Sequence, residues 1–334
     1  MAENGIYRDS KIVDVLCAQA NHERLDSNVV KDAEDLYASL YNDLNPMNKH
    51  LLANLVTFAV ERQLPAETNW RNLIADEKQI GDGDEAAFRV KDEGIKAFIQ
   101  AEGSTTPRTR VAHHRVVLDT VAVSARPVAG LIELRSGKTS MADLVNDATR
   151  EMANAENAYI ENVLTSAVTN WGTPFYGTGS GIVAATIDPM IQHWLRTGSV
   201  AIVGDIAAIQ KLAALTGFTT TTSTVAYPDS IMEEFNRTGR IGFYKGASVV
   251  QFLNPYEADG TTTAMKQGYL YIIPTAARVE DRPLKVVRKG SILTVDHTDI
   301  NDLTYEIRMD QLFGAGIAMG THPMMSVYRD STLS

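Results

Sequence analysis

The feature that most constrains this fold is a long amphipathic segment from Ser140 to Val168. Apolar side chains recur along it at helical spacing, which predicts one helix with a single apolar stripe. The members of this stripe are Met141, Leu144, Val145, Ala148, Met152, Ala155, Tyr159 and Val163. Ser140 and Asp143 have the spacing of a capping box, and Gly172 and Pro174 follow the end. At about 1.5 Å per residue the helix is a rod of roughly 43 Å, which predicts the spine of an elongated domain.

A sustained coiled coil is the alternative interpretation of this segment. The stripe is rich in alanine and too short for several firm heptads, which favours a helix packed within a single domain.

Composition and charge exclude several classes of protein. The chain has 334 residues, of which 44% are hydrophobic and 22% charged, the usual balance of a globular protein with a buried core. The net charge is −10, from 31 Lys and Arg against 41 Asp and Glu, so we do not expect a nucleic-acid reader. A mildly acidic surface instead suits a container wall, because like charge keeps packaged DNA from adhering to it.

Cysteine content and hydropathy exclude further classes. Cys17 is the only cysteine, which excludes an intramolecular disulfide and a cysteine-rich metal site. No run approaches the roughly 20 apolar residues of a membrane span, so we expect no membrane partner and no export signal. We expect the chain to be cytosolic when made, and the start at Met1 leads us to expect no large N-terminal segment that is cleaved off.

The N-terminal region predicts short helices. The pattern Ile12, Val13, Val15, Leu16 fits either a short helix or an extended arm that docks on a neighbour, and the sequence does not separate the two. Residues 32–44 and 48–62 have helical periodicity, with Pro46 and Pro65 expected to mark the helix ends.

A charged β-ribbon is predicted next. Two β-prone stretches, residues 87–99 and 110–124, are joined by a tip that contains Gly103 and Pro107. A two-stranded ribbon of this size is marginal unless something packs against it, so a projecting arm implies a partner surface. The alternative, that the ribbon folds back as the edge of a larger sheet, fits these residues equally well. The candidate subunit-contact residues on the ribbon are Arg89, Lys91, Lys96, Arg108 and Arg110.

The rest of the chain alternates helix and strand signals, so the fold class is α+β. Asp188 and Pro189 are expected to cap and open a helix, residues 199–204 to form a buried strand, and residues 205–217 an amphipathic helix. Residues 268–274 read as a core strand, and further strands follow toward the C-terminus.

The segment from Ile231 to Phe252 predicts a short helix, a glycine stop and a strand. Gly239 follows the predicted helix, and Gly242 and Gly246 bracket Phe243 and Tyr244 before the β-branched Val249 and Val250. This order resembles the axial domain of tailed-phage major capsid proteins. The order of elements over residues 77–329 likewise resembles their Hong Kong 97-type fold, which encapsulin nanocompartments share.

The resemblance implies an architecture and a function. The implied parts are an N-terminal arm (1–45), a peripheral domain with the spine helix (46–76, 128–187 and 283–334), an extended loop (77–127) and an α/β axial domain (188–282). It implies a major capsid protein whose extended loop lies over an adjacent subunit and which forms pentamers and hexamers of an icosahedral shell. The implied partners are further copies of the chain, a portal protein, scaffolding or decoration proteins, and packaged double-stranded DNA contacted non-specifically. The implied location is the virion capsid, assembled in the host cytoplasm.

We find no candidate catalytic, cofactor or metal site in the sequence, and we expect no enzyme. His113 and His114 are adjacent, so on a strand they face opposite sides and cannot share a metal ion. The glycine-rich stretch 177–181 lacks the lysine of a phosphate-binding loop, and we interpret it as a flexible loop. Some members of the resembled family join subunits by a Lys-to-Asn isopeptide bond. Lys91 and Lys96 have no identifiable partner for that reaction and are interpreted as solvated lysines.

Two alternatives to a phage capsid remain open at the level of sequence. An encapsulin-like compartment would share the fold and enclose protein cargo. A soluble α+β enzyme with an unrecognised site would instead behave as a monomer or dimer.

Overall fold

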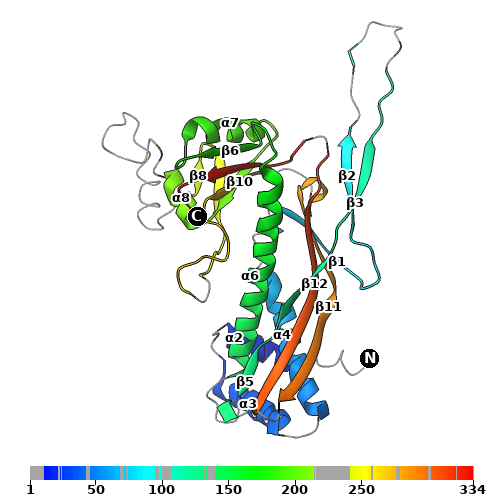
Figure 1. Cartoon of the computed structure of the whole chain (residues 1–334), viewed down its shortest axis with the longest axis vertical. Coiled ribbons are helices and arrows are strands. Elements are labelled where there is room, and N and C mark those ends of the chain that lie inside the picture. The colour runs from blue at the N-terminus through cyan, green and yellow to red at the C-terminus, as the bar shows by residue number, and fades with distance from the viewer. Residues whose placement is uncertain are drawn as a thin grey trace.

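The protein is an elongated body with a β-ribbon that projects beyond one end (Figure 1). The structure is a computed structural model. It describes residues 11–333 apart from 22, 24, 43–45, 68–70, 73, 95–97, 100–104, 106, 131, 134–139, 214, 216–240, 257–258, 276–278, 300–301 and 321. The short helix predicted at the start of the segment 231–252 lies outside the described residues.

The described elements are a mixture of helices and strands that come partly in runs of one kind, which is an α+β fold. The helices are α2 (Lys11–Ala20), α3 (Ser27–Asn42), α4 (Pro46–Glu67), α6 (Met141–Val168), α7 (Ala184–Leu195), α8 (Ile206–Ala213) and the 3-10 helix η2 (Val279–Asp281). The strands of the first half are β1 (Ala75–Ile80), β2 (Ala87–Glu93), β3 (Ala112–Val117), β4 (Val121–Ala125), β5 (Val128–Gly130) and β6 (Tyr176–Gly179). The later strands are β7 (Val200–Gly204), β8 (Phe243–Tyr244), β9 (Ala247–Gln251), β10 (Tyr269–Pro274), β11 (Leu284–Asp299), β12 (Thr304–Ile317) and β13 (Ser326–Asp330).

The predicted spine helix is confirmed as α6, which runs along the body (Figure 1). Its start is a capping box, in which the Asp143 amide donates to Ser140 Oγ at 3.0 Å and the Ser140 amide donates to the Asp143 carboxylate. The first half buries the predicted stripe, as at Val145 and Met152. The second half does not, because Ala155 is exposed and Tyr159 only half-buried. The residues buried there are Glu156, Asn157, Ile160, Glu161 and Leu164.

A five-stranded sheet lies beside α6. Its order is β1-β11-β12-β4, with β5 also paired to β12; β1 runs parallel to β11, and the other neighbours are antiparallel. One face of the sheet packs against the helix, where Leu284, Val286 and Phe313 meet Ile160 and Leu164. Every one of these five side chains is almost completely buried, so this is a continuous core.

Buried charges cross the interface between α6 and the sheet. Arg71 Nη1 lies 2.6 Å from Glu156 Oε2, and both side chains are fully buried. Arg288 of β11 contacts the same carboxylate at 2.8 Å through Nη2 and reaches Glu77 of β1 at 2.8 Å through Nη1. Asn157 accepts a hydrogen bond from Arg71 Nε at 2.9 Å. Burial lowers the pKa of Arg71 from its ordinary value, and the neighbouring Glu156 carboxylate opposes that shift.

These partners explain the departure from the predicted stripe. Glu156 enters the core of α6 where two buried cations meet it, because an unpaired buried charge is far more costly than a paired one. Glu161 instead accepts a hydrogen bond from the Lys266 amide.

The second sheet has six strands in the order β6-β13-β10-β7-β9-β8. All five residues of β7 and all six of β10 are buried, which confirms both predicted core strands. α7 and α8 pack against this sheet through Ile191, Trp194 and Ile209, together with Ile202 and Ile272. Figure 1 shows this sheet and its two helices grouped beside the upper end of α6.

The structure decides the form of the N-terminal segment and the extent of the following helix. Residues 11–20 form the helix α2, which packs Val13 and Leu16 into the same core as α4 and α6. The prediction that Pro65 ends a helix is wrong, because α4 continues to Glu67. Proline there removes one hydrogen bond in the last turn without ending the helix.

The predicted start of α7 at Asp188 and Pro189 is also wrong. The helix begins at Ala184, and the completely buried Ile187 holds its first turn in the core, with Pro189 inside the helix. The Asp188 carboxylate accepts a hydrogen bond from the Tyr244 hydroxyl at 3.0 Å instead of capping the helix.

Sheet membership crosses several of the predicted domain boundaries. β6 and β13, from stretches expected in the peripheral domain, belong to the six-stranded sheet, and β4, from the expected extended loop, belongs to the five-stranded one. Residues 11–42 of the expected arm form helices that pack in part on the body. The division into domains itself stays a prediction.

The charge cluster gives a test of stability. Glu156→Gln keeps the shape of the side chain but leaves Arg71 and Arg288 without their shared carboxylate, and we expect a loss of about 3 kcal/mol in the free energy of unfolding. Urea denaturation of the unassembled chain measures it. Glu151→Gln, on the exposed face of the same helix, is the matched control and should leave stability unchanged. Equal stability of the two variants would contradict the structural role of the cluster.

Glu161 gives a test of pH dependence. Burial raises the pKa of Glu161, and a hydrogen bond from the Lys266 amide, 2.8 Å long, opposes the shift. A carboxylate with a raised pKa costs stability above that pKa, and the cost disappears as the pH falls below the unfolded-state value of about 4.3. We therefore expect Glu161→Gln to stabilise the chain at pH 7 and to lose that advantage at pH 4 in urea denaturation. An advantage that grows on acidification would show the sign to be wrong.

Candidate assembly surface

The predicted ribbon is confirmed in part as the two-stranded antiparallel sheet of β2 and β3. Arg89 lies opposite Arg115, Lys91 lies opposite His113, and the register shifts between Lys91 and Glu93. The strands are shorter than predicted because residues 121–125 leave the ribbon and pair with β12 as β4. Among the described residues neither strand pairs with another sheet, so the alternative of a folded-back edge is wrong.

The ribbon is anchored at its base. Phe88 is 2% exposed and packs with Ala86 against Val287 on the outer face of β11. Lys78 Nζ lies 4.5 Å from the centre of the Phe88 ring, a cation–π contact on the same side. Beside it the buried Lys285 ammonium donates to the Asp76 carboxylate at 3.1 Å. These contacts fix where the ribbon leaves the body.

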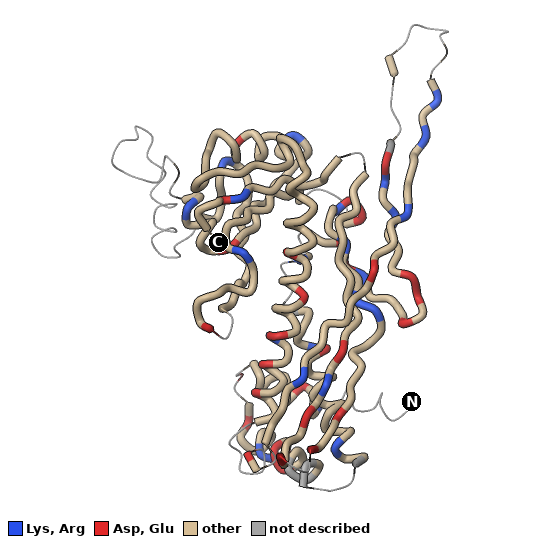
Figure 2. Tube along the Cα trace, viewed as in Figure 1, with Lys and Arg blue, Asp and Glu red and all other residues tan. Residues whose placement is uncertain are grey.

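Exposed cations follow the ribbon outward from this base. Arg89, Lys91, Arg108 and Arg110 are all exposed, and none of them forms an ion pair with another residue that the structure describes. Lys96, the fifth predicted contact residue, lies outside the described residues. Figure 2 shows blue segments along the projecting ribbon, well beyond the body. The ribbon therefore presents positive charge to whatever lies next to it.

Two acidic groups near these cations already have partners. Arg115 pairs with Glu85 below the ribbon, and His114 Nδ1 lies 2.7 Å from Asp92 Oδ1. In the part of the chain that the structure describes, no group of three or more His, Cys, Asp or Glu side chains is placed to hold a metal ion. The predictions of no metal and no cofactor therefore stay predictions.

The glycine-rich stretch 177–181 is not the flexible loop that we predicted. Its first three residues belong to β6, which pairs in parallel with β13. A Cβ at Gly177 would lie 2.6 Å from Met190 Cε, so glycine is required there for close packing. The Gly181 amide donates to the Asp330 carboxylate at 2.9 Å. Although burial raises the pKa of Asp330, hydrogen bonds from Thr332, Lys211 and Gly181 lower it to about 2, so the carboxylate is charged and opposes a phosphate.

Similarity to known proteins gives the family to which the chain belongs. The family model described as "SPbeta prophage-derived putative capsid protein YonB" matches residues 10–327. The chain belongs to this family. No curated protein matches it.

Three similar solved structures come from phages or from a virus-like particle. The mature capsid of bacteriophage PhiM1 has a TM-score of 0.51 and 12% identity, covering 78% of this chain and 87% of that one. Mycobacterium phage Che8 has a TM-score of 0.49 and 16% identity, covering 75% and 85%. The virus-like particle from Pyrococcus furiosus has a TM-score of 0.45 and 12% identity, covering 82% and 97%. Of these three the PhiM1 capsid carries the fold assignment.

The chain is therefore a capsid protein with the major capsid fold of tailed phages, as the resemblance implied. Its place is the virion capsid. The encapsulin-like compartment is not favoured, because the family is one of capsid proteins. Among the described helices of this capsid protein, none combines the length and apolar character that a membrane crossing needs.

Sequence reasoning identified the cations of the ribbon but missed the residues that hold it. Phe88 was visible as the only aromatic residue among the charges of β2, which could have marked an anchor. Its partners Val287, Lys285 and Asp76 could not be found, because they are about 10 to 200 positions away in sequence and meet it only in the fold.

The anchor gives a test of ribbon order. Phe88→Ala removes the buried ring from Val287 and should cost about 3 kcal/mol of local stability. Hydrogen exchange of the β2 and β3 amides should accelerate, while exchange in α6 stays slow. Val111→Ala, at a ribbon side chain that is 44% exposed, is the control and should leave exchange unchanged. Unchanged exchange in Phe88→Ala would mean that the ribbon is held elsewhere.

Proposed function

We propose that this capsid protein builds pentamers and hexamers of an icosahedral phage shell by head-to-tail contacts, in which the ribbon of each copy lies on the next. The observation that carries the proposal is the ribbon itself, anchored at its base and lined with exposed cations. A contact between two different patches of one chain generates rings when the rotation closes. A projecting arm supplies one patch, and the body of the neighbour supplies the other.

We propose Arg89, Lys91, Lys96, Arg108 and Arg110 as the contact residues of the arm. Like charges on neighbouring copies repel, so the arm's cations must meet acidic groups on the receiving body, and the net charge of −10 makes such groups plentiful. Electrostatic complementarity of this kind fixes the register of the contact and speeds encounter more than it adds affinity.

The same net charge bears on the contents of the shell. We propose that it encloses double-stranded DNA without gripping it, because an acidic wall repels phosphates. The proposed role is structural and not catalytic, with assembly in the host cytoplasm. A portal protein and scaffolding or decoration proteins are the further partners that a shell of this kind would take.

Charge reversal of the arm tests the proposal. The double variant Arg108→Glu and Arg110→Glu should fold normally, because both side chains are exposed and pair with no described residue, but should form few or no shells. Negative-stain electron microscopy counts the shells, and circular dichroism checks the fold. Absorbance at 260 and 280 nm on the same fraction reports enclosed nucleic acid.

The control has the same change in net charge at other sites. Lys31→Glu with Arg196→Glu alters two exposed residues on α3 and at the end of α7. This double variant should assemble like the unchanged chain. An undiminished yield of shells from the arm variant would overturn the proposed role of the ribbon. If the unchanged chain forms only small soluble particles under all conditions, the proposal that it builds a shell is wrong.

A further inference from the structure

Half of the long strand β11 has an open edge. β1 pairs with β11 only from Leu284 to Lys289, where β1 ends at Ile80. β11 continues to Asp299 and pairs with β12 on its other side. Among the described residues no strand lies along the edge beyond Lys289. An unpaired edge of this length is a template for another strand.

The backbone groups that point to this edge can be identified. The Ile292 amide donates to Glu61 Oε1 of α4 at 2.9 Å, away from β12. Alternate residues of a strand direct their backbone groups to the same side. Thr294, Asp296 and Thr298 therefore direct their N–H and C=O groups to the open edge.

The pairing of β12 agrees with this direction. The Ile307 amide donates to the Pro127 carbonyl at 3.1 Å, on the side of β4. The backbone N–H and C=O groups of its neighbour Arg308 consequently point toward β11, where Arg308 lies opposite Val295. The backbone groups of Val295 therefore pair with β12. The backbone groups of the residues on either side of it, Thr294 and Asp296, point to the open edge.

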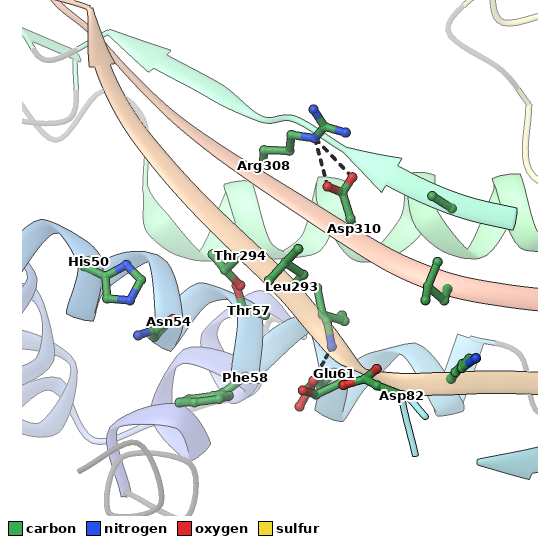
Figure 3. A pocket seen from close by; sticks show the side chains of 15 residues that line it. His50, Asn54, Thr57, Phe58, Glu61, Asp82, Leu293, Thr294, Arg308 and Asp310 are labelled. Atoms are coloured by element: carbon green, nitrogen blue, oxygen red, sulfur yellow. Dashed lines mark hydrogen bonds and ion pairs between the residues drawn. The ribbon is translucent and has the colours of Figure 1, made fainter. Parts of the chain in front are cut away.

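A groove runs along the same edge, between α4 and the sheet (Figure 3). Its volume of about 750 Å³ leaves room for an extended strand of several residues. The Nδ2 atom of Asn54, on the α4 wall, is buried and has no hydrogen-bond partner among the described residues. Leu293 is 63% and Val295 54% exposed on the outer face beside it, although both are apolar. The groove thus offers unpaired backbone groups, a spare amide donor and apolar contacts.

We propose that this groove receives the ribbon of a second copy of the chain, which adds to β11 as a further strand. The inference rests on the proposed function and names the surface that the arm contacts. Within one molecule the ribbon is anchored at Val287 and leads away from the groove (Figure 1), so the strand must come from another copy. In the described part of the ribbon both outer edges lack a strand partner, so it can pair in turn.

Charge favours the same occupant. The groove is lined by Glu61 and Asp82, and by an Asp310 carboxylate that Arg308 neutralises at 2.9 Å. Lys289 is the remaining cation of the lining, so the acidic groups exceed the basic ones. The described ribbon has the opposite balance, with the exposed cations named above.

The test measures binding of a ribbon peptide to the unassembled full-length chain. A fluorescent peptide of residues 108–117 is titrated while its polarisation is followed. Thr298→Pro removes an edge N–H that β12 does not use, and proline is tolerated on edge strands. It should weaken binding roughly tenfold, because a backbone hydrogen bond is lost and the ring obstructs the edge. Thr298→Val, which keeps the N–H, should bind like the unchanged chain.

Three results would overturn the proposal. They are equal binding to the proline variant, equal binding of a scrambled peptide with the same charge, and displacement of the ribbon peptide by a peptide of residues 1–10. Circular dichroism of both Thr298 variants checks that they fold. Failure of the unchanged chain to form shells would overturn the proposed function. The peptide titration instead measures binding at the edge of β11 and does not depend on assembly.

Discussion

The body of the protein depends on a carboxylate that two arginines share inside it. Glu156 of α6 is fully buried between Arg71, which precedes β1, and Arg288 of β11. Three separate stretches of the chain are joined at this point. Removal of any one of these charges would leave a buried charge without its partner, which is strongly destabilising. Around it the apolar residues of α6 and of the sheet form one continuous core, so helix and sheet behave as a rigid unit.

The strand β11 connects this unit to the two surfaces that we propose for contacts with other copies. Its inner face carries Arg288 and Val286 against α6, and its outer face carries Val287 under the ribbon. Further along, the same strand loses its neighbour β1 and leaves an edge open. Anchor, core and open edge therefore have a fixed geometry with respect to one another, because they belong to one strand.

A rigid body with a protruding arm is suited to repetitive assembly. The arm projects beyond the body of its own molecule, and the body offers an acidic groove next to an unpaired strand edge. Membership of a capsid family gives this arrangement its biological setting. Since each proposed contact joins unlike patches, the same two surfaces could serve rings of different size with small changes in angle.

Local patterns in the sequence determined the helix Met141–Val168, its capping box and the buried strands Val200–Gly204 and Tyr269–Pro274. They also determined the existence of a charged ribbon, since periodicity and turn residues act over a few neighbouring positions. Only the tertiary structure decided that Glu156 is a core residue, because its partners lie 85 and 132 positions away. It likewise decided that residues 177–179 are a strand, in which Gly177 and Gly179 lie too close to neighbouring side chains for a Cβ. Burial of charge and close approach of backbones depend on contacts between distant segments, which no local pattern records.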